Sequence, residues 1–138
     1  MKKRVESDVP SILVKDGVEI NDLNSPNKEV INIEDILLDA PESSWSKRII
    51  DTESNSATLI CQNPGEGNRE HYHHDWNEWW YIIDGLWEWQ IEGETKIVGK
   101  GDIVFIEKGR LHKITAVGKE PAIRLAVSRS DVDHVYVE

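Results

Sequence analysis

From residue 45 onward, short stretches with strand character are separated by turn signals, and this pattern limits the fold more than any other feature of the chain. Pairs such as Asp84-Gly85 and Glu92-Gly93 are typical of the tight turns between strands. The predicted strands span residues 45–51, 57–61, 69–73, 78–83, 86–92, 95–98, 102–106, 112–117, 122–127 and 132–137. No helical pattern lies between them, so a parallel sheet with crossover helices is not expected. The pattern predicts an all-β sandwich or barrel over residues 46–138.

Residues 1–45 differ from the rest and are predicted to form an N-terminal extension. An Asp16-Gly17 pair lies between two short apolar runs, residues 11–14 and 18–20, and this arrangement predicts a hairpin. Residues 33–38 predict a short helix that ends before Pro41.

The composition excludes several classes of protein. A chain of 138 residues corresponds to one domain, and its net charge of −10 argues against nucleic acid or an anionic membrane surface as a partner. The single cysteine, Cys61, rules out an intrachain disulfide, and no apolar run has the length of a signal peptide core or a membrane span. The simplest expectation is a soluble protein of the reducing cytoplasm.

Residues 70–85 read EHYHHDWNEWWYIIDG and crowd histidines beside a carboxylate. Alternate side chains of a strand point to one face, so His71 and His73 are expected to project together, and His74 away from them. Glu78 begins the next predicted strand, and His112 begins another after a glycine-containing turn. These four side chains can share one divalent ion, and the alternative is a set of hydrogen-bonded polar residues in the core. The remaining histidine, His134, has no evident partner in the sequence.

At these residues the chain resembles the cupin family. The first cupin motif is matched by Gly65, His71, His73, Glu78 and Gly85 at every spacing. The second motif is matched by Gly101, Gly109 and His112, whereas Glu107 stands where proline is usual and Ala116 where asparagine is usual. The resemblance covers residues 57–127 and implies a jelly-roll β-barrel. It also implies a divalent metal held by His71, His73, Glu78 and His112, with open positions for water or substrate.

The resemblance carries expectations about activity. The spacing from the His-x-His pair to Glu78 is similar to that of acireductone and quercetin dioxygenases, which implies an oxygen-dependent oxidoreductase acting on a small organic, anionic or aromatic, substrate. A mixed histidine and carboxylate set suits Fe(II) first, with Mn, Ni, Zn or Cu as alternatives, and Glu78 is a candidate catalytic base as well as a ligand. One fold hosts many functions, so two alternatives remain. The first is a metal-dependent lyase or isomerase, and the second is a module that binds a small ligand without turnover.

The tryptophans allow two interpretations. Trp80 and Ile82 share the face of Glu78, and Trp87 and Trp89 form a second stripe. They are predicted either to line an aromatic substrate cavity or to pack as an ordinary core.

Trp79 and Tyr81 are then expected to point outward, which suggests a sheet face covered by a second subunit. Cupins are often dimers, so a homodimer is expected.

Two arginines are candidates for aiming a guanidinium at an anionic substrate. Arg69 shares the strand of His71, and Arg110 comes two residues before His112. The alternative for both is a solvated rim of the barrel.

Overall fold

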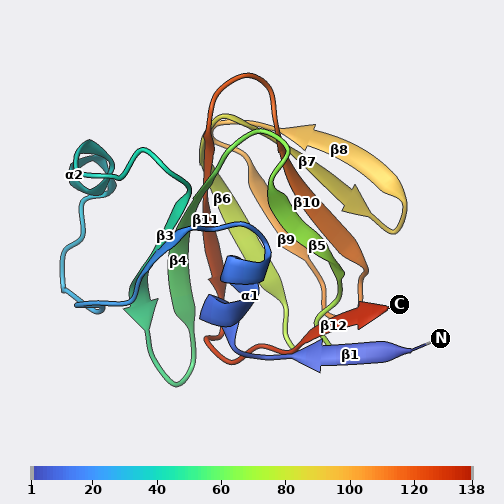
Figure 1. The fold of residues 1–138 in the computed structure, drawn as a ribbon. Coiled ribbons are helices and arrows are strands. Elements are labelled where there is room, and N and C mark those ends of the chain that lie inside the picture. Colours follow the sequence, from blue (N-terminus) through green and yellow to red (C-terminus); the bar gives the residue numbers. More distant parts are fainter. Residues whose placement is uncertain (1, 138) are drawn as a thin grey trace.

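The computed structural model describes residues 2–137, and most of them form β-strands (Figure 1). The strands are β1 (Lys3–Glu6), β2 (Ile20–Asp22), β3 (Trp45–Asp51), β4 (Ser56–Gln62), β5 (Gly67–His71), β6 (Glu78–Asp84), β7 (Leu86–Ile91), β8 (Glu94–Val98), β9 (Ile103–Ile106), β10 (His112–Val117), β11 (Ala122–Ser128) and β12 (His134–Val137). The two helices are α1 (Val9–Lys15) and α2 (Ile33–Leu38). The prediction of an all-β fold is confirmed, and each predicted strand is found with shifts at its ends.

Two larger sheets face each other. One has six strands in the order β2-β3-β4-β11-β6-β9, and the other has four in the order β5-β10-β7-β8. Neighbouring strands are antiparallel, except that β2 runs parallel to β3. The main hydrophobic core lies on the inward faces of these strands and contains the fully buried Trp80, Trp87 and Trp89.

The hairpin predicted around Asp16-Gly17 is wrong, because the segment forms helix α1 instead. Pro10 lies in the first turn of the helix, where its fixed φ is favourable and its missing N–H costs nothing. Gly17 follows the helix with a φ of +99°, and Val18 N–H donates to the carbonyl of Leu13 at 2.9 Å. The Asp-Gly pair therefore ends a helix. A helix end of this kind needs a residue with a positive φ, as a tight hairpin turn does, and glycine suits both.

Helix α1 is packed onto the barrel rather than extended from it. Leu13 and Val18 form a buried cluster with Ile60 of β4. Figure 1 shows α1 lying across the strands, with α2 set apart on the outer side of β3. The prediction of a short helix at residues 33–38 is confirmed, and the side chain of Asn32 accepts a hydrogen bond from Asp35 N–H at its start.

The two ends of the chain meet in a separate two-stranded ribbon. Strand β1 pairs antiparallel with β12, so that Glu6 lies opposite His134 and Arg4 opposite Tyr136. Both ends of the ribbon can be followed in Figure 1, where the termini lie close together. The ribbon thus ties the N-terminal extension to the last strand of the barrel.

Neither helix within residues 2–137 has the length and apolar character needed to cross a membrane.

Candidate metal centre

Four histidines and one glutamate converge inside the fold. His71 ends β5, while Glu78, His112 and His134 begin β6, β10 and β12 respectively, and His73 lies in the segment after β5. All five side chains are buried, with residue exposures from 0 to 7%. Ligand atoms lie within 4.8 Å of one another in two overlapping triads, His71–His73–His134 and His73–Glu78–His112. Strand pairing brings them together, because His71 is the register partner of His112.

Each of the four imidazoles is fixed in the same tautomer by a backbone carbonyl. The Nδ1 atom of His71 lies 2.6 Å from the carbonyl oxygen of Arg69, and that of His73 lies 2.9 Å from the carbonyl oxygen of Asp133. The Nδ1 atom of His112 lies 2.9 Å from the carbonyl oxygen of Arg110, and that of His134 lies 3.0 Å from the carbonyl oxygen of Val132. A carbonyl oxygen only accepts, so each Nδ1 carries a proton, and in the neutral imidazole the lone pair is on Nε2. Bonds of this kind hold metal-binding histidines in the required orientation. The Nε2 atom of His73 also contacts the Glu78 carboxylate.

The Nε2 atoms provide a test of whether the site fits a metal ion. Within residues 2–137, the buried Nε2 atoms of His71 and His112 have no hydrogen-bond partner, and the Nε2 atom of His73 has only the Glu78 carboxylate, at 2.5 Å. Buried polar atoms in folded proteins are nearly always satisfied, so two unpaired ring nitrogens in one place require an explanation. Neutral imidazole and carboxylate are the donors that divalent transition metals prefer. The donor set therefore fits a divalent ion.

The electrostatics keep most of these groups in the form that binds metal. Burial lowers the pKa of His71 and lowers the pKa of His112 and of His134 to about 4, so these imidazoles are neutral near pH 7. Burial alone would lower the pKa of His73 and raise that of Glu78. Their mutual attraction outweighs it, so that the pKa of His73 is raised and that of Glu78 lowered.

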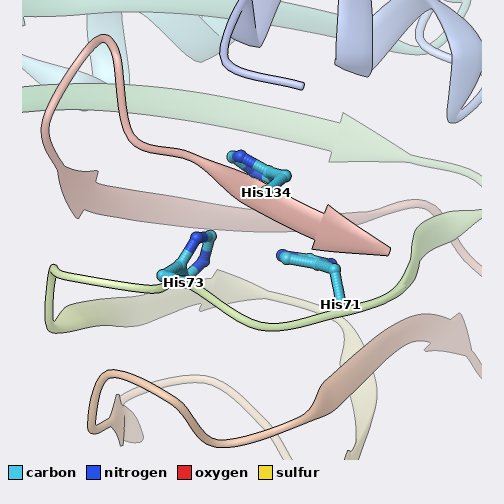
Figure 2. Close-up of side chains that lie close together, drawn as sticks. All are labelled: His71, His73 and His134. Atoms are coloured by element: carbon cyan, nitrogen blue, oxygen red, sulfur yellow. The ribbon is translucent and has the colours of Figure 1, made fainter. Parts of the chain in front are cut away.

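The structure brings together all four side chains for which a metal role was predicted, and it leaves His74 exposed, as alternation predicted. Sequence reasoning missed His134, whose ring lies 4.6 Å from the rings of both His71 and His73 between centroids (Figure 2). The predicted strand at residues 132–137 carried no signal that could have found it, because His134, Val135 and Tyr136 are all buried and the two faces of the strand are not distinguished there.

The four residues predicted to bind substrate lie in the hydrophobic core. Trp80, Ile82, Trp87 and Trp89 have exposures of 0–1%, because both sheets close over them. Trp80 also lines a cavity of about 30 Å³ together with Glu78 and His134 of the candidate metal centre. Trp87 and Trp89 pack in the core, which is the second of the two predicted alternatives. The guanidinium carbon of the buried Arg124 lies 4.4 Å from the ring centroid of Trp87.

The two arginines predicted to contact substrate do not point into the metal centre. Arg69 donates to Asp16 at 2.5 Å and stacks over Tyr136, because its strand faces the C-terminal end of α1. Arg110 is exposed on the turn before β10, although its carbonyl orients His112. Arg110 therefore lies on the solvated rim of the barrel, as the alternative prediction had it.

A different arginine, Arg48 of β3, lines the 30 Å³ cavity together with Glu78, Trp80 and His134. Arg48 is 7% exposed, and its contacts are long, at 3.4 Å from Nε to Thr58 Oγ1 and 3.9 Å from Nη1 to Asp51. Side chains of α1 form the opposite wall of the cavity: Val9, Ile12 and Leu13. The cavity therefore joins the candidate metal centre to a buried, weakly paired cation beneath α1. Sequence reasoning missed Arg48, because nothing near it in the chain resembles a site.

Comparison with known proteins agrees with this arrangement. The family model described as the cupin domain matches residues 58–128, just over half of the chain. An uncharacterized conserved protein with a double-stranded β-helix domain from Klebsiella pneumoniae subsp. pneumoniae has a TM-score of 0.65 at 18% identity, over 81% of this chain and 100% of that chain. The predicted jelly-roll fold is thereby confirmed.

Curated relatives match shorter segments. The mannose-1-phosphate guanylyltransferase ManC of Salmonella typhimurium is 34% identical over 62 residues, which are 45% of this chain and 13% of that protein. The tetracenomycin polyketide synthase protein TcmJ of Streptomyces glaucescens is 30% identical over 80 residues, which are 54% of each. The chain thus spans from about an eighth to about half of the length of these relatives. With the family model matched over half of its length and both motif histidine sets in one buried cluster, the chain belongs to the cupin domain family.

Proposed function

We propose that the protein is a metal-dependent enzyme that acts on a small, anionic organic substrate. One observation carries the proposal: the buried Nε2 atoms of His71 and His112 have no hydrogen-bond partner and lie in two overlapping triads that also contain Glu78, in a fold whose family is shown. A purely structural cluster would be expected to satisfy these atoms with hydrogen bonds.

His71, His73, Glu78 and His112 would hold the ion, which when bound supplies a Lewis acid and, if it is iron, a redox centre. The carbonyl oxygens of Arg69, Asp133 and Arg110 keep three of the imidazoles oriented, so little reorganisation is needed on binding. Glu78 also lines the 30 Å³ cavity, where its carboxylate can accept a proton from a bound substrate.

The preference for an anion rests on Arg48. Its guanidinium is buried beside the cavity, where its contacts with Thr58 and Asp51 are long, so a carboxylate or phosphate of the substrate would be a closer partner. A cavity of about 30 Å³ holds water rather than an organic molecule, so the substrate enters when α1 moves away from the barrel. Among the relatives, TcmJ is named as a tetracenomycin polyketide synthase protein, which agrees with a small organic substrate.

Oxygen-dependent oxidation is the first candidate reaction, because a set of imidazoles with one carboxylate suits Fe(II). A lyase or isomerase reaction, in which the ion only polarises a carbonyl group, is the second candidate. A fourth imidazole, that of His134, lies 4.6 Å from the rings of His71 and His73, and it favours this second reaction because it reduces the room for substrate and oxygen together.

The test is the metal content of protein purified without added metal, for the wild type, His112→Ala and the exposed control His74→Ala. About one equivalent of metal in the wild type and the control, lost in His112→Ala, supports the proposal. An absence of metal in all three proteins, with none taken up on titration with Fe(II), Zn(II) or Mn(II), contradicts it. Oxygen consumption with small keto acids then separates oxidation from lyase or isomerase chemistry.

A further inference from the structure

His134 lies against His71 and His73 of the histidine cluster, although it is six residues beyond the segment matched by the family model, which ends at residue 128. Its ring is stacked on that of His71, with an interplanar angle of 24°, and is perpendicular to that of His73, at 87°. Figure 2 shows the His134 ring on β12 facing the other two across a short gap. The ring is 6% exposed and lines the small cavity.

The tautomer of His134 matches that of the other three imidazoles. Its Nδ1–H donates to Val132 O at 3.0 Å, which leaves Nε2 with a free lone pair. A ligand atom of His134 lies within 4.8 Å of ligand atoms of both His71 and His73. With Nδ1 occupied, the atom available for this is Nε2.

The segment that carries His134 is built into the site. Asp133 O accepts the Nδ1–H of His73, so one short stretch orients two imidazoles. Tyr72 and Val135 exchange two backbone hydrogen bonds, of 3.1 and 2.9 Å, which fix the segment between His71 and His73 against β12. On its other side β12 pairs with β1, where His134 lies opposite Glu6.

From this geometry we infer that His134 is a fifth protein ligand of the metal ion, so that the ion is held by four histidines and one glutamate. The two triads cannot describe two ions, because they share His73, and Nε2 is the one ring nitrogen of His73 that a backbone carbonyl does not occupy. The inference rests on the metal binding proposed above. An octahedral ion with five protein ligands keeps one position for water or substrate, whereas four ligands keep two.

The inference also gives the N-terminal extension a role. Strand β1 holds the strand that carries His134, and α1 covers the cavity that His134 lines. Residues 3–15 would then help to complete the coordination of the ion as well as to close the site.

The test counts the imidazoles that bind zinc. In protein labelled with ¹⁵N-histidine, a long-range ¹H–¹⁵N correlation spectrum resolves the five histidines, and an Nε2 that binds zinc moves away from its free position. Four zinc-shifted Nε2 signals, with His74 unchanged, are expected for one equivalent of zinc. Three shifted signals, with His134 unchanged, would overturn the inference and leave the proposed function intact. No shifted signal would contradict the proposed function itself. Saturation at two equivalents would point to a second ion and also overturn the inference.

Variants give an independent measurement. The zinc affinity of His134→Ala and His134→Gln, measured by competition with a chelator, is expected to fall by at least about tenfold, because a neutral imidazole donor is replaced by water or a weaker amide. His74→Ala is the matched control and should keep the wild-type affinity. If both His134 variants bind zinc within about twofold of the wild type, His134 is not a ligand. The wild-type spectrum decides the question even if neither variant folds.

Discussion

The Nε2 atom of His73 lies 2.5 Å from Oε1 of Glu78, and both side chains are buried. In the absence of metal this contact raises the pKa of His73 against the effect of burial, and it keeps the pKa of Glu78 low. The same two side chains belong to the triad with His112. A metal ion and a proton therefore compete for the space between His73 and Glu78.

Glu78→Gln is expected to weaken zinc binding by about a hundredfold or more, since it removes the only carboxylate of the set and keeps its volume. Competition with a chelator measures the loss. Glu88→Gln, a half-buried residue on β7, is the matched control and should bind zinc as the wild type does. An unchanged affinity in Glu78→Gln would remove the glutamate from the ligand set.

The metal-free protein is expected to lose stability when the pH falls from 7 to 5. His112 and His134 have folded-state pKa values of about 4, against about 6.5 when unfolded, so the unfolded state binds more protons in this range. At pH 5 each of them lowers the free energy of unfolding by on the order of 2 kcal/mol. His73 acts in the opposite direction. Because its pKa is raised on folding, it stabilises the folded state fully at pH values below 6.5, and this stabilisation is lost as the pH rises through the folded-state pKa.

Urea denaturation of chelator-treated protein at pH 7 and pH 5 measures this effect. The loss of stability between the two values should be smaller in His134→Gln, which has no imidazole to protonate at that position. Equal stability of the wild type at the two pH values would mean that the histidines are solvated rather than buried as the structure has them.

The sequence predicted the barrel strands and the four motif residues because these depend on local alternation and on spacings within 41 residues, from His71 to His112. His134 could not be placed in the same way. It reaches the site through the pairing of β12 with the segment at Tyr72, which is a contact between distant parts of the chain.

The error at Asp16-Gly17 has a similar origin. A left-handed glycine ends helices as well as forming hairpins, and the choice was decided by packing. Ile12 and Leu13 of helix α1 bury their side chains against the barrel. The helix has seven residues, and in so short a segment the pattern of apolar residues does not distinguish a helix from a strand.

Gly67→Ala is expected to separate β5 from β10 and so to disturb the pairing of His71 with His112. A Cβ atom at Gly67 would lie 1.8 Å from the backbone oxygen of Ile114, so the backbone must shift. A loss of about 1–3 kcal/mol in the free energy of unfolding is expected, as for other overpacked sites, together with weaker zinc binding. Gly99→Ala is the control, because its Cβ would lie 3.2 Å from the flexible end of Leu86 and at an ordinary contact distance of 3.7 Å from the backbone oxygen of Gly85. Equal stability of the two variants would contradict the close approach of the strands.

The outer face of β6 and β9 carries a patch of exposed apolar side chains in register. Trp79 lies opposite Phe105, and Tyr81 lies opposite Ile103, with exposures of 39, 59, 38 and 64%. Strand β9 is also the edge of the six-stranded sheet. Exposed apolar patches of this kind mark interaction surfaces, and we propose that a second copy of the chain covers this one.

Phe105→Glu is therefore expected to convert a dimer into a monomer, because it places a charge in the centre of the apolar patch. Sedimentation equilibrium of the wild type and the variant measures the change. Ile97→Glu is the matched control, since Ile97 is 58% exposed on β8 of the other sheet and should leave the dimer intact. A monomeric wild type, or a dimer that dissociates in Ile97→Glu and not in Phe105→Glu, would exclude this face as the interface. Zinc binding should be unchanged in Phe105→Glu, because the patch lies on the outer face of the sheet whereas the histidine cluster is buried inside the fold.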